Sequence, residues 1–203
     1  MIIVPMERRH AKAVARLHCA SVKGLLSDLG PRAATAFYAG CATARSARAF
    51  VGVEEEAVVG FVLGSVSPAS IRQESMRENP VATLSGLGLG IVRRPATLRW
   101  LLRSFRGPDE GNYDARVAEL TYIAIAPESR SLGLGGRLVE AFSQAMQEAG
   151  ASAYELSVDD DNRRAIGFYE RLGFRQVGLY REFGTLHRRL RLELSPPATP
   201  MTP

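Results

Sequence analysis

The chain has little cysteine and little histidine, and it lacks any long hydrophobic run. Its two cysteines, Cys19 and Cys41, are too few for the disulfide framework of a small secreted domain, so we expect two free thiols in a reducing compartment. No apolar stretch reaches the roughly 20 residues that a membrane-spanning helix needs. The apolar start, Met1–Pro5, is too short for the core of a signal peptide. We therefore expect a cytoplasmic protein without stable membrane insertion.

The size and composition are those of one globular domain. The 203 residues are 46% hydrophobic and 7% aromatic, which is enough for a sizeable core. The formal net charge is +5, and nearly all of the 26 basic residues are arginine. Such a charge favours an anionic small ligand, a nucleic acid or an anionic membrane surface. The sequence has no nucleic-acid-binding motif, so we expect a small anionic ligand and no nucleic acid partner.

One stretch combines an apolar strand pattern, a glycine-rich loop and an amphipathic helix pattern. Residues 120–126 are rich in β-forming side chains, and apolar residues recur at helical spacing over 138–149. Gly133, Gly135 and Gly136 therefore lie at a helix N-terminus. Backbone N–H groups at such a terminus have no partner within the helix, and together with the helix dipole they bind phosphate. The stretch predicts a phosphate cradle.

The residues around these glycines exclude two common nucleotide loops. A P-loop ends in Gly-Lys followed by Ser or Thr, but here the last glycine is followed by Arg137 and Leu138. Leu138 also stands where a dinucleotide fingerprint has its third small residue. The remaining pattern, Arg130-x-x-Gly133-x-Gly135 directly after a strand, resembles the acetyl-CoA pyrophosphate loop of the GNAT superfamily of acyl-CoA N-acyltransferases. For this motif taken alone, a glycine-rich turn without a ligand is the alternative.

A second motif, residues 156–174, is ordered and spaced as in the same superfamily. A strand pattern leads to Asn162, which is a favourable helix cap, and a short helical pattern then carries Tyr169 before a closing glycine. The strong resemblance covers residues 118–174. It is weaker over the N-terminal third and absent over 65–116.

The resemblance implies an α/β (α+β) fold. It consists of a mixed, mostly antiparallel sheet of six to seven strands, flanked by helices, with a V-shaped splay between strands 4 and 5. We expect one GNAT domain over residues 1–195 and a disordered tail over 196–203. Residues 68–116 form an insertion in which apolar periodicity predicts two helices. We expect this insertion to cover the acceptor side of the cleft, where its arginines would select an acidic acceptor; a solvated basic face is the alternative.

The N-terminal third reads as a strand followed by two helices. Ile2–Pro5 has a strand pattern, and we expect helices over Glu7–Ser21 and Pro31–Ala42. His18 and Cys19 in the first helix suggest a base and a nucleophile. Adjacent helix residues point apart, however, so we interpret them as residues of the core or the cleft wall.

The resemblance also implies acetyl-CoA as the co-substrate and no metal. The pyrophosphate would lie on the glycine loop, and the pantetheine arm would pair with the strand Glu119–Ala126 where it splays from Ala153–Val158. The implied acetyl-CoA-binding residues are Ile123, Ala124, Ile125, Arg130, Ser131, Leu132, Gly133, Leu134, Gly135, Gly136, Asn162, Phe168 and Tyr169.

Two side chains are implied as catalytic. Tyr169 takes the family position whose phenol lies near the CoA sulfur. An ordinary tyrosine has a pKa of about 10, so at neutral pH it can donate a proton to the leaving thiolate; the alternative is packing against CoA. Glu119 aligns with the catalytic glutamate of histone acetyltransferases in the superfamily. It would accept the amine proton through a raised pKa or a water relay; the alternative is a strand-end carboxylate that faces solvent or pairs with an arginine.

Together these features predict an N-acetyltransferase that moves an acetyl group from acetyl-CoA to a primary amine by direct transfer in a ternary complex. We favour a small molecule or an amino sugar as the acceptor, and we expect a monomer or homodimer. A protein acceptor, at a lysine or an N-terminus, is the alternative. Ser157 argues against the N-terminal case, because several members with such substrates carry a glutamate there. Alternatives of other classes are a non-catalytic acetyl-CoA-binding regulatory module, and a peripheral membrane or nucleic-acid binder that uses the insertion.

Overall fold

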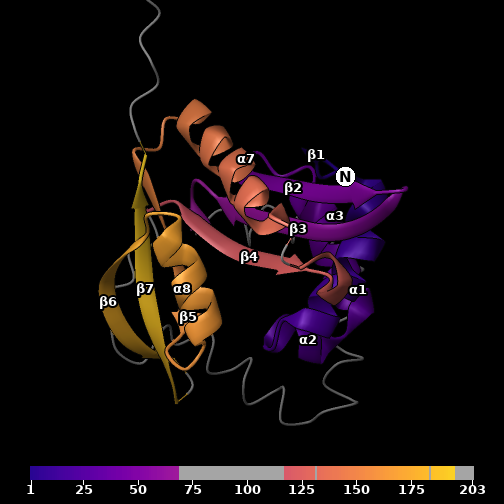
Figure 1. Cartoon of the computed structure of the whole chain (residues 1–203). Coiled ribbons are helices and arrows are strands. Elements are labelled where there is room, and N and C mark those ends of the chain that lie inside the picture. The colour runs from indigo at the N-terminus through magenta and orange to yellow at the C-terminus, as the bar shows by residue number, and fades with distance from the viewer. Residues whose placement is uncertain (69–116, 131, 183, 195–203) are drawn as a thin grey trace, which may run out of the picture.

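A seven-stranded sheet forms the centre of the computed structural model, which describes residues 1–68, 117–130, 132–182 and 184–194 (Figure 1). In sheet order the strands are β1 (Ile2–Pro5), β2 (Ala47–Glu54), β3 (Ala57–Ser65), β4 (Glu119–Ile125), β5 (Ala153–Asp159), β7 (Thr185–Glu193) and β6 (Arg175–Glu182). Neighbouring strands are antiparallel except β4 and β5, which are parallel. The mixed, mostly antiparallel sheet that the sequence predicts is therefore confirmed.

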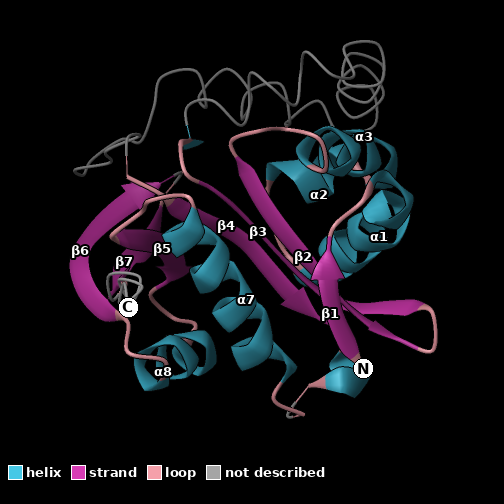
Figure 2. Ribbon diagram, turned by 90° about the horizontal axis from the view of Figure 1, so that it is seen from above, coloured by secondary structure: helices cyan, strands magenta, loops and turns pink. Residues whose placement is uncertain are grey.

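Helices cover both faces of this sheet (Figure 2). The N-terminal helices α1 (Ala11–Ser21), α2 (Leu25–Leu29) and α3 (Pro31–Cys41) lie on one face, and α7 (Leu134–Glu148) and α8 (Arg163–Arg171) lie on the other. Each face buries its own apolar cluster, one around α1 and α3 and one around α7. Burial of both sheet faces against helices stabilises the arrangement of the strands that carry the site.

Two glycines of the sheet allow α7 to approach it closely. A Cβ atom placed on Gly52 of β2 would lie 2.8 Å from Leu134 Cδ1, and one on Gly60 of β3 would lie 2.9 Å from Leu134 Cδ2. Any side chain at these positions would overlap the buried Leu134 side chain at the start of α7 and force it to move. The glycines thus fix the height of the α7 N-terminus over β2 and β3.

The N-terminal helices differ from the prediction in two details. The expected helix over Glu7–Ser21 is split, because a short 3-10 turn over Arg8–His10 precedes α1. The five-residue helix α2 was not predicted; Gly24 and Gly30 bracket it, and its length is too short for a periodic pattern. The helices expected in the 68–116 insertion, and the 196–203 tail, lie outside the described residues apart from Pro68 itself.

Candidate functional site

The parallel strands β4 and β5 pair at one end only. Their register contains the single pair Glu119–Glu155, supported by a 2.9 Å hydrogen bond from Glu155 N to Ala118 O. Beyond that pair the two strands diverge toward their carboxyl ends, whereas β5 and β7 stay paired over the full length of β5. We refer to this divergence as the β4–β5 splay, with its closed end at Glu119–Glu155. Its open end faces the loops that follow Ile125 and Asp159.

The loop after β4 carries the predicted phosphate cradle at this open end. A 3-10 turn, Pro127–Ser129, leads to Arg130, whose Nε donates to Ile125 O at 3.3 Å. Gly133 then takes a φ of 76°, a left-handed conformation that favours glycine, and α7 begins at the next residue. The first N–H groups of α7 therefore point out of the helix end, beside an arginine, as a bound pyrophosphate requires.

Packing separates the roles of the loop glycines. A Cβ atom on Gly135 would lie 3.0 Å from Ile125 Cδ1 and 3.1 Å from Phe168 Cζ, so this glycine joins β4, α7 and α8. Among the described residues, a Cβ atom on Gly136 would meet only Leu172 Cδ2, at 3.9 Å, and one on Gly133 would meet none within 4 Å. The cradle thus packs closely against β4 and α8 at Gly135, whereas Gly133 and Gly136 leave space for a ligand.

The other predicted acetyl-CoA residues divide between the two faces of the sheet. Ile123 and Ile125 are partly buried against the core beneath α7, whereas Ala124 is buried in the core around α1 and α3. Leu132 is 61% exposed on the cradle loop, and Leu134 is buried. Ser131 lies outside the described residues.

At the other side of the open end, Asn162 caps α8, and Tyr169 lies farther along this helix in the core beneath α7. The Asn162 Oδ1 atom accepts a hydrogen bond from Ala165 N at 3.1 Å, which caps the helix as the sequence predicts. The Tyr169 ring is 7% exposed and packs edge-on against Phe168 and Phe174. Burial raises the pKa of Tyr169, so its phenol is firmly protonated at neutral pH.

The closed end of the splay is polar. Arg189 of β7 contacts Glu119 Oε1 through Nη1 at 3.2 Å and Glu155 Oε2 through Nε at 2.7 Å. Its Nη1 also donates to Ser157 Oγ at 2.9 Å, and Ser157 accepts a second hydrogen bond from Tyr180 at 2.8 Å. Glu119 thus pairs with an arginine, and its role as the base stays a prediction. No local sequence pattern pointed to Arg189, because its position opposite Ser157 depends on the β5–β7 register.

His18 lies in the core rather than in a catalytic pair with Cys19. Its ring is 1% exposed, and its Nδ1 is 2.7 Å from the Tyr38 hydroxyl, with which it shares a hydrogen bond. The ring also meets Tyr122 of β4 edge-on, with centroids 4.7 Å apart. Burial lowers the pKa of His18 to about 4 and raises that of Cys19. Cys19 and Cys41 are thiols and do not form a disulfide.

This burial predicts an acid-sensitive fold. Between the ordinary histidine pKa of about 6.5 and the folded value of about 4, His18 is protonated only in the unfolded chain. The free energy of unfolding should therefore fall as the pH is lowered through this window, by at most about 3 kcal/mol from this residue. Urea unfolding of the wild type and of His18→Gln between pH 7 and pH 4 measures the contribution. Equal pH slopes in the two proteins would contradict it.

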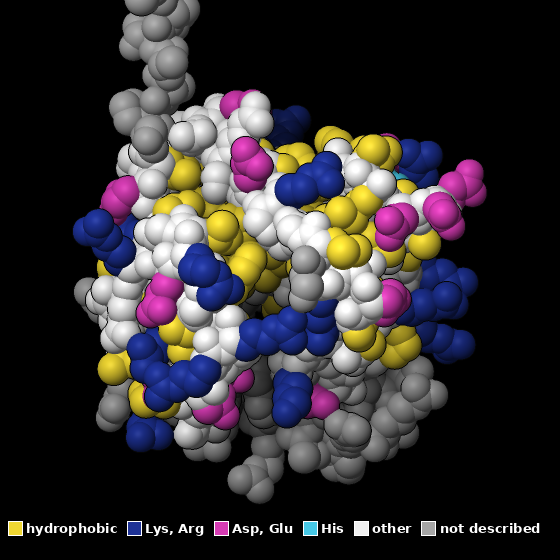
Figure 3. All heavy atoms as spheres, viewed as in Figure 1, with side chains coloured by type: hydrophobic (Ala, Val, Ile, Leu, Met, Phe, Trp, Pro, Cys, Tyr) yellow, Lys and Arg dark blue, Asp and Glu magenta, His cyan; other side chains and the backbone are white. Residues whose placement is uncertain are grey.

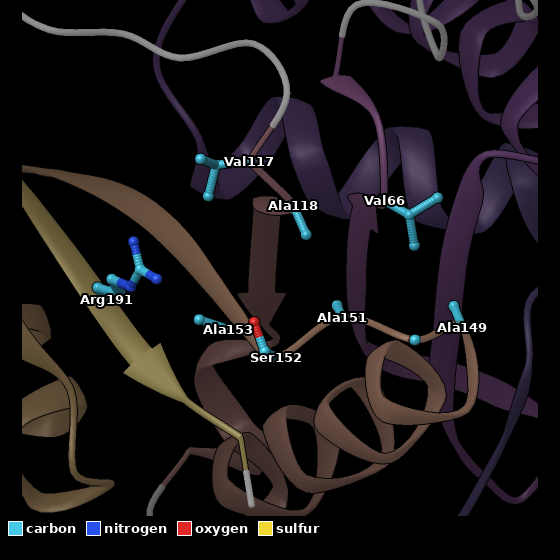
Figure 4. A pocket seen from close by; sticks show the side chains of 9 residues that line it. Val66, Val117, Ala118, Ala149, Ala151, Ser152, Ala153 and Arg191 are labelled. Carbon is cyan, nitrogen blue, oxygen red and sulfur yellow. The ribbon is translucent and has the colours of Figure 1, made fainter. Parts of the chain in front are cut away.

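The described residues also form a cavity of about 320 Å³ away from the cradle (Figure 4). It lies at the amino ends of β4 and β5, where Ala118 and Ala153 line it, and Arg191 reaches its edge. Because the cradle lies at the carboxyl ends of the same strands, this cavity is not part of it.

The face that carries α7 and α8 combines apolar, acidic and basic side chains. Figure 3 shows Lys and Arg side chains on both sides of a hollow near the centre of this face. Positive charge there favours a polyanionic ligand over an uncharged one. In the part of the chain that the structure describes, no helix is long and apolar enough to cross a bilayer. Those residues also include no cluster of His, Cys, Asp and Glu suited to a metal ion.

Comparison with protein families assigns this splayed, helix-flanked sheet to a known class of transferases. The model of the acetyltransferase (GNAT) family matches residues 16–174. The chain therefore belongs to the GNAT acetyltransferase family, as its sequence motifs predicted.

Similar proteins give less detail than the family. Mycothiol acetyltransferase of Paenarthrobacter aurescens is 37% identical over 67 residues, which are 33% of this chain and 20% of that protein. The matched region thus spans one-fifth of the length of this relative. Among solved structures, the ribosomal-protein-S18-alanine N-acetyltransferase of Escherichia coli covers 99% of this chain and 98% of its own, at a TM-score of 0.61 and 15% identity. An aminoglycoside 6′-acetyltransferase of type Ii covers 97% of this chain and 99% of its own, at a TM-score of 0.62 and 15% sequence identity. These structures share the fold.

Proposed function

We propose that the protein is an acetyl-CoA-dependent N-acetyltransferase acting on a primary amine, with direct transfer in a ternary complex. The observation that carries this proposal is the joint geometry of the cradle and the splay. The α7 N-terminus with its open glycines Gly133 and Gly136 lies at the open end of two diverging parallel strands. A ligand with a pyrophosphate and a long amide-bearing arm fits such a site, because N–H groups hold the phosphates and unpaired strand edges receive the amides.

In this proposal the backbone supplies most of the binding. The pyrophosphate lies on the first turn of α7 beside Arg130, and the pantetheine amides pair with β4 near Ile123 and Ile125. Asn162, which caps α8 at the opposite side, also hydrogen-bonds the arm. A main-chain N–H of β4 polarises the thioester carbonyl, because fixed dipoles stabilise the oxyanion that forms when the amine attacks.

Two side chains handle the protons. The amine nitrogen forms a bond to the acetyl carbon, the carbon–sulfur bond breaks, and the leaving thiolate takes a proton from Tyr169. The amine proton leaves toward Glu119. Arg189 already contacts Glu119 Oε1 at 3.2 Å, so in this proposal a water carries the amine proton to the carboxylate.

We propose a small molecule or an amino sugar as the acceptor. The name of the relative, mycothiol acetyltransferase, supports a small acceptor. The hydroxyl of Ser157 supports it too, since it is engaged by Arg189 and Tyr180 and offers no carboxylate to an N-terminal ammonium group.

A screen of primary amines with acetyl-CoA, following the release of free thiol, tests the function. We expect thiol release to depend on one amine class and to stop when that amine is omitted. Calorimetry with acetyl-CoA runs in parallel. Binding of acetyl-CoA without thiol release for any amine would favour the non-catalytic regulatory module, and the absence of binding would refute both.

A further inference from the structure

Among the described residues, Arg189 is the only buried arginine, with 6% of its surface exposed. Burying a guanidinium costs solvation free energy, which partner carboxylates must offset. Burial lowers the pKa of Arg189, but Glu119 and Glu155 outweigh this and raise it above the ordinary value. The cation is therefore held in place by two carboxylates that are themselves only 12% exposed.

The two carboxylates belong to different strands, and neither belongs to the strand of Arg189. In the sheet order β4-β5-β7, β7 neighbours β5 but not β4. The guanidinium nevertheless contacts Glu119 on β4, so it reaches across β5 while also contacting Glu155 and Ser157 on β5. A planar guanidinium presents several N–H donors in a fixed fork, which allows one side chain to join groups on two strands.

This connection lies at a critical point of the sheet. Glu119 and Glu155 form the single register pair between β4 and β5, and the strands diverge from there. Their neighbours Leu120, Leu156 and Leu190 pack in the core beneath α7, so the polar groups lie on the opposite face of the sheet. Without the cation, two carboxylates would repel each other at the one position where the strands must stay together.

We propose that Arg189 is a positioning residue that holds the closed end of the β4–β5 splay together and thereby sets the separation of the two strands that receive the pantetheine arm. The inference rests on the proposed acetyl-CoA-dependent function. It predicts different effects on the two parts of the ligand. The closed end of the splay affects binding of the arm and the acetyl group, whereas the cradle at the open end binds the pyrophosphate.

The test compares Arg189→Met and Arg189→Lys with Arg191→Met and Arg191→Lys. Arg191 is a matched control, because it lies on the same strand and contacts the same Glu155 at 3.5 Å. Its side chain is 35% exposed, and it forms ion pairs with Glu155 and Glu193. Lysine keeps the charge but offers a single point of contact, so Arg189→Lys tests the bridge even where Arg189→Met fails to fold.

Calorimetry measures the affinity of each variant for acetyl-CoA and for 3′-phospho-ADP, which carries the pyrophosphate without the arm. For Arg189→Lys we expect acetyl-CoA affinity to fall on the order of 10-fold, the effect of one or two lost hydrogen bonds. The affinity for 3′-phospho-ADP should stay within about twofold of the wild type. Both Arg191 variants should bind both ligands as the wild type does. General destabilisation would weaken the two ligands together.

Three results would overturn the inference. The first is an Arg189→Lys variant that binds acetyl-CoA as tightly as Arg191→Lys does. The second is an equal loss of affinity for the two ligands. The third is failure of both Arg189 variants to fold while both Arg191 variants fold, which would make Arg189 a support of the whole sheet. A wild-type protein that binds no acetyl-CoA would instead refute the proposed function itself.

Discussion

Replacement of Gly136 by aspartate is expected to abolish acetyl-CoA binding while the protein stays folded. A side chain fits there, because the nearest atom to a Cβ would be Leu172 Cδ2 at 3.9 Å. A carboxylate in the first turn of α7 also interacts favourably with the helix dipole, by about 0.3–1 kcal/mol. The same carboxylate would face the pyrophosphate, and such like-charge contact costs several kcal/mol. We therefore expect at least about a 100-fold loss of affinity.

Gly136→Asn is the matched control, since asparagine has nearly the same shape without the charge. We expect it to weaken acetyl-CoA binding far less than aspartate does, and calorimetry together with thermal unfolding measures both variants. Gly135→Asp is a poorer test, because its Cβ would press on Ile125 and Phe168 at 3.0–3.1 Å and a loss of fold could mimic a loss of binding. Wild-type affinity in Gly136→Asp would rule out the cradle as the pyrophosphate site.

The parts of the fold that the sequence predicted are those with local signals. The glycine spacing and the helical stripe located the start of α7, and Asn162 located the start of α8. These signals act within a few residues along the chain, so they are readable without tertiary information. The parallel β4–β5 arrangement followed from the resemblance that these local motifs established.

The features that the sequence did not predict depend on contacts between distant segments. Arg189 meets Glu119 across 70 positions of the chain, and His18 meets Tyr38 across 20. Both contacts require strand register or helix packing that no local pattern encodes. Irregularities in pairing, such as the shift between Leu63 and Gly64 against β4, also change which side chains share a face. The charged closed end of the splay was therefore visible only in the structure.

Replacement of Tyr169 by phenylalanine is expected to lower turnover about 10- to 1000-fold and to leave acetyl-CoA affinity nearly unchanged. The ring packs against Phe168 and Phe174, and phenylalanine keeps these contacts. Only the proposed proton donor is lost. Because burial raises the pKa of Tyr169, proton transfer to a thiolate is uphill, so we expect a smaller loss than the roughly 10⁴-fold that general acids reach.

The matched control is Tyr154→Phe, which removes a phenol from the same core. The Tyr154 hydroxyl shares a 2.8 Å hydrogen bond with Ser143 of α7, and burial raises its pKa to about 12. Loss of the Tyr154 hydroxyl should lower the free energy of unfolding by about 1 kcal/mol, the contribution of one hydrogen bond. Turnover should stay near the wild-type value. Thiol release with the acceptor found in the amine screen gives kcat for both variants, and calorimetry gives the affinity for acetyl-CoA. If Tyr169→Phe turns over as fast as Tyr154→Phe, the Tyr169 phenol is a packing group and the thiolate takes its proton from another source.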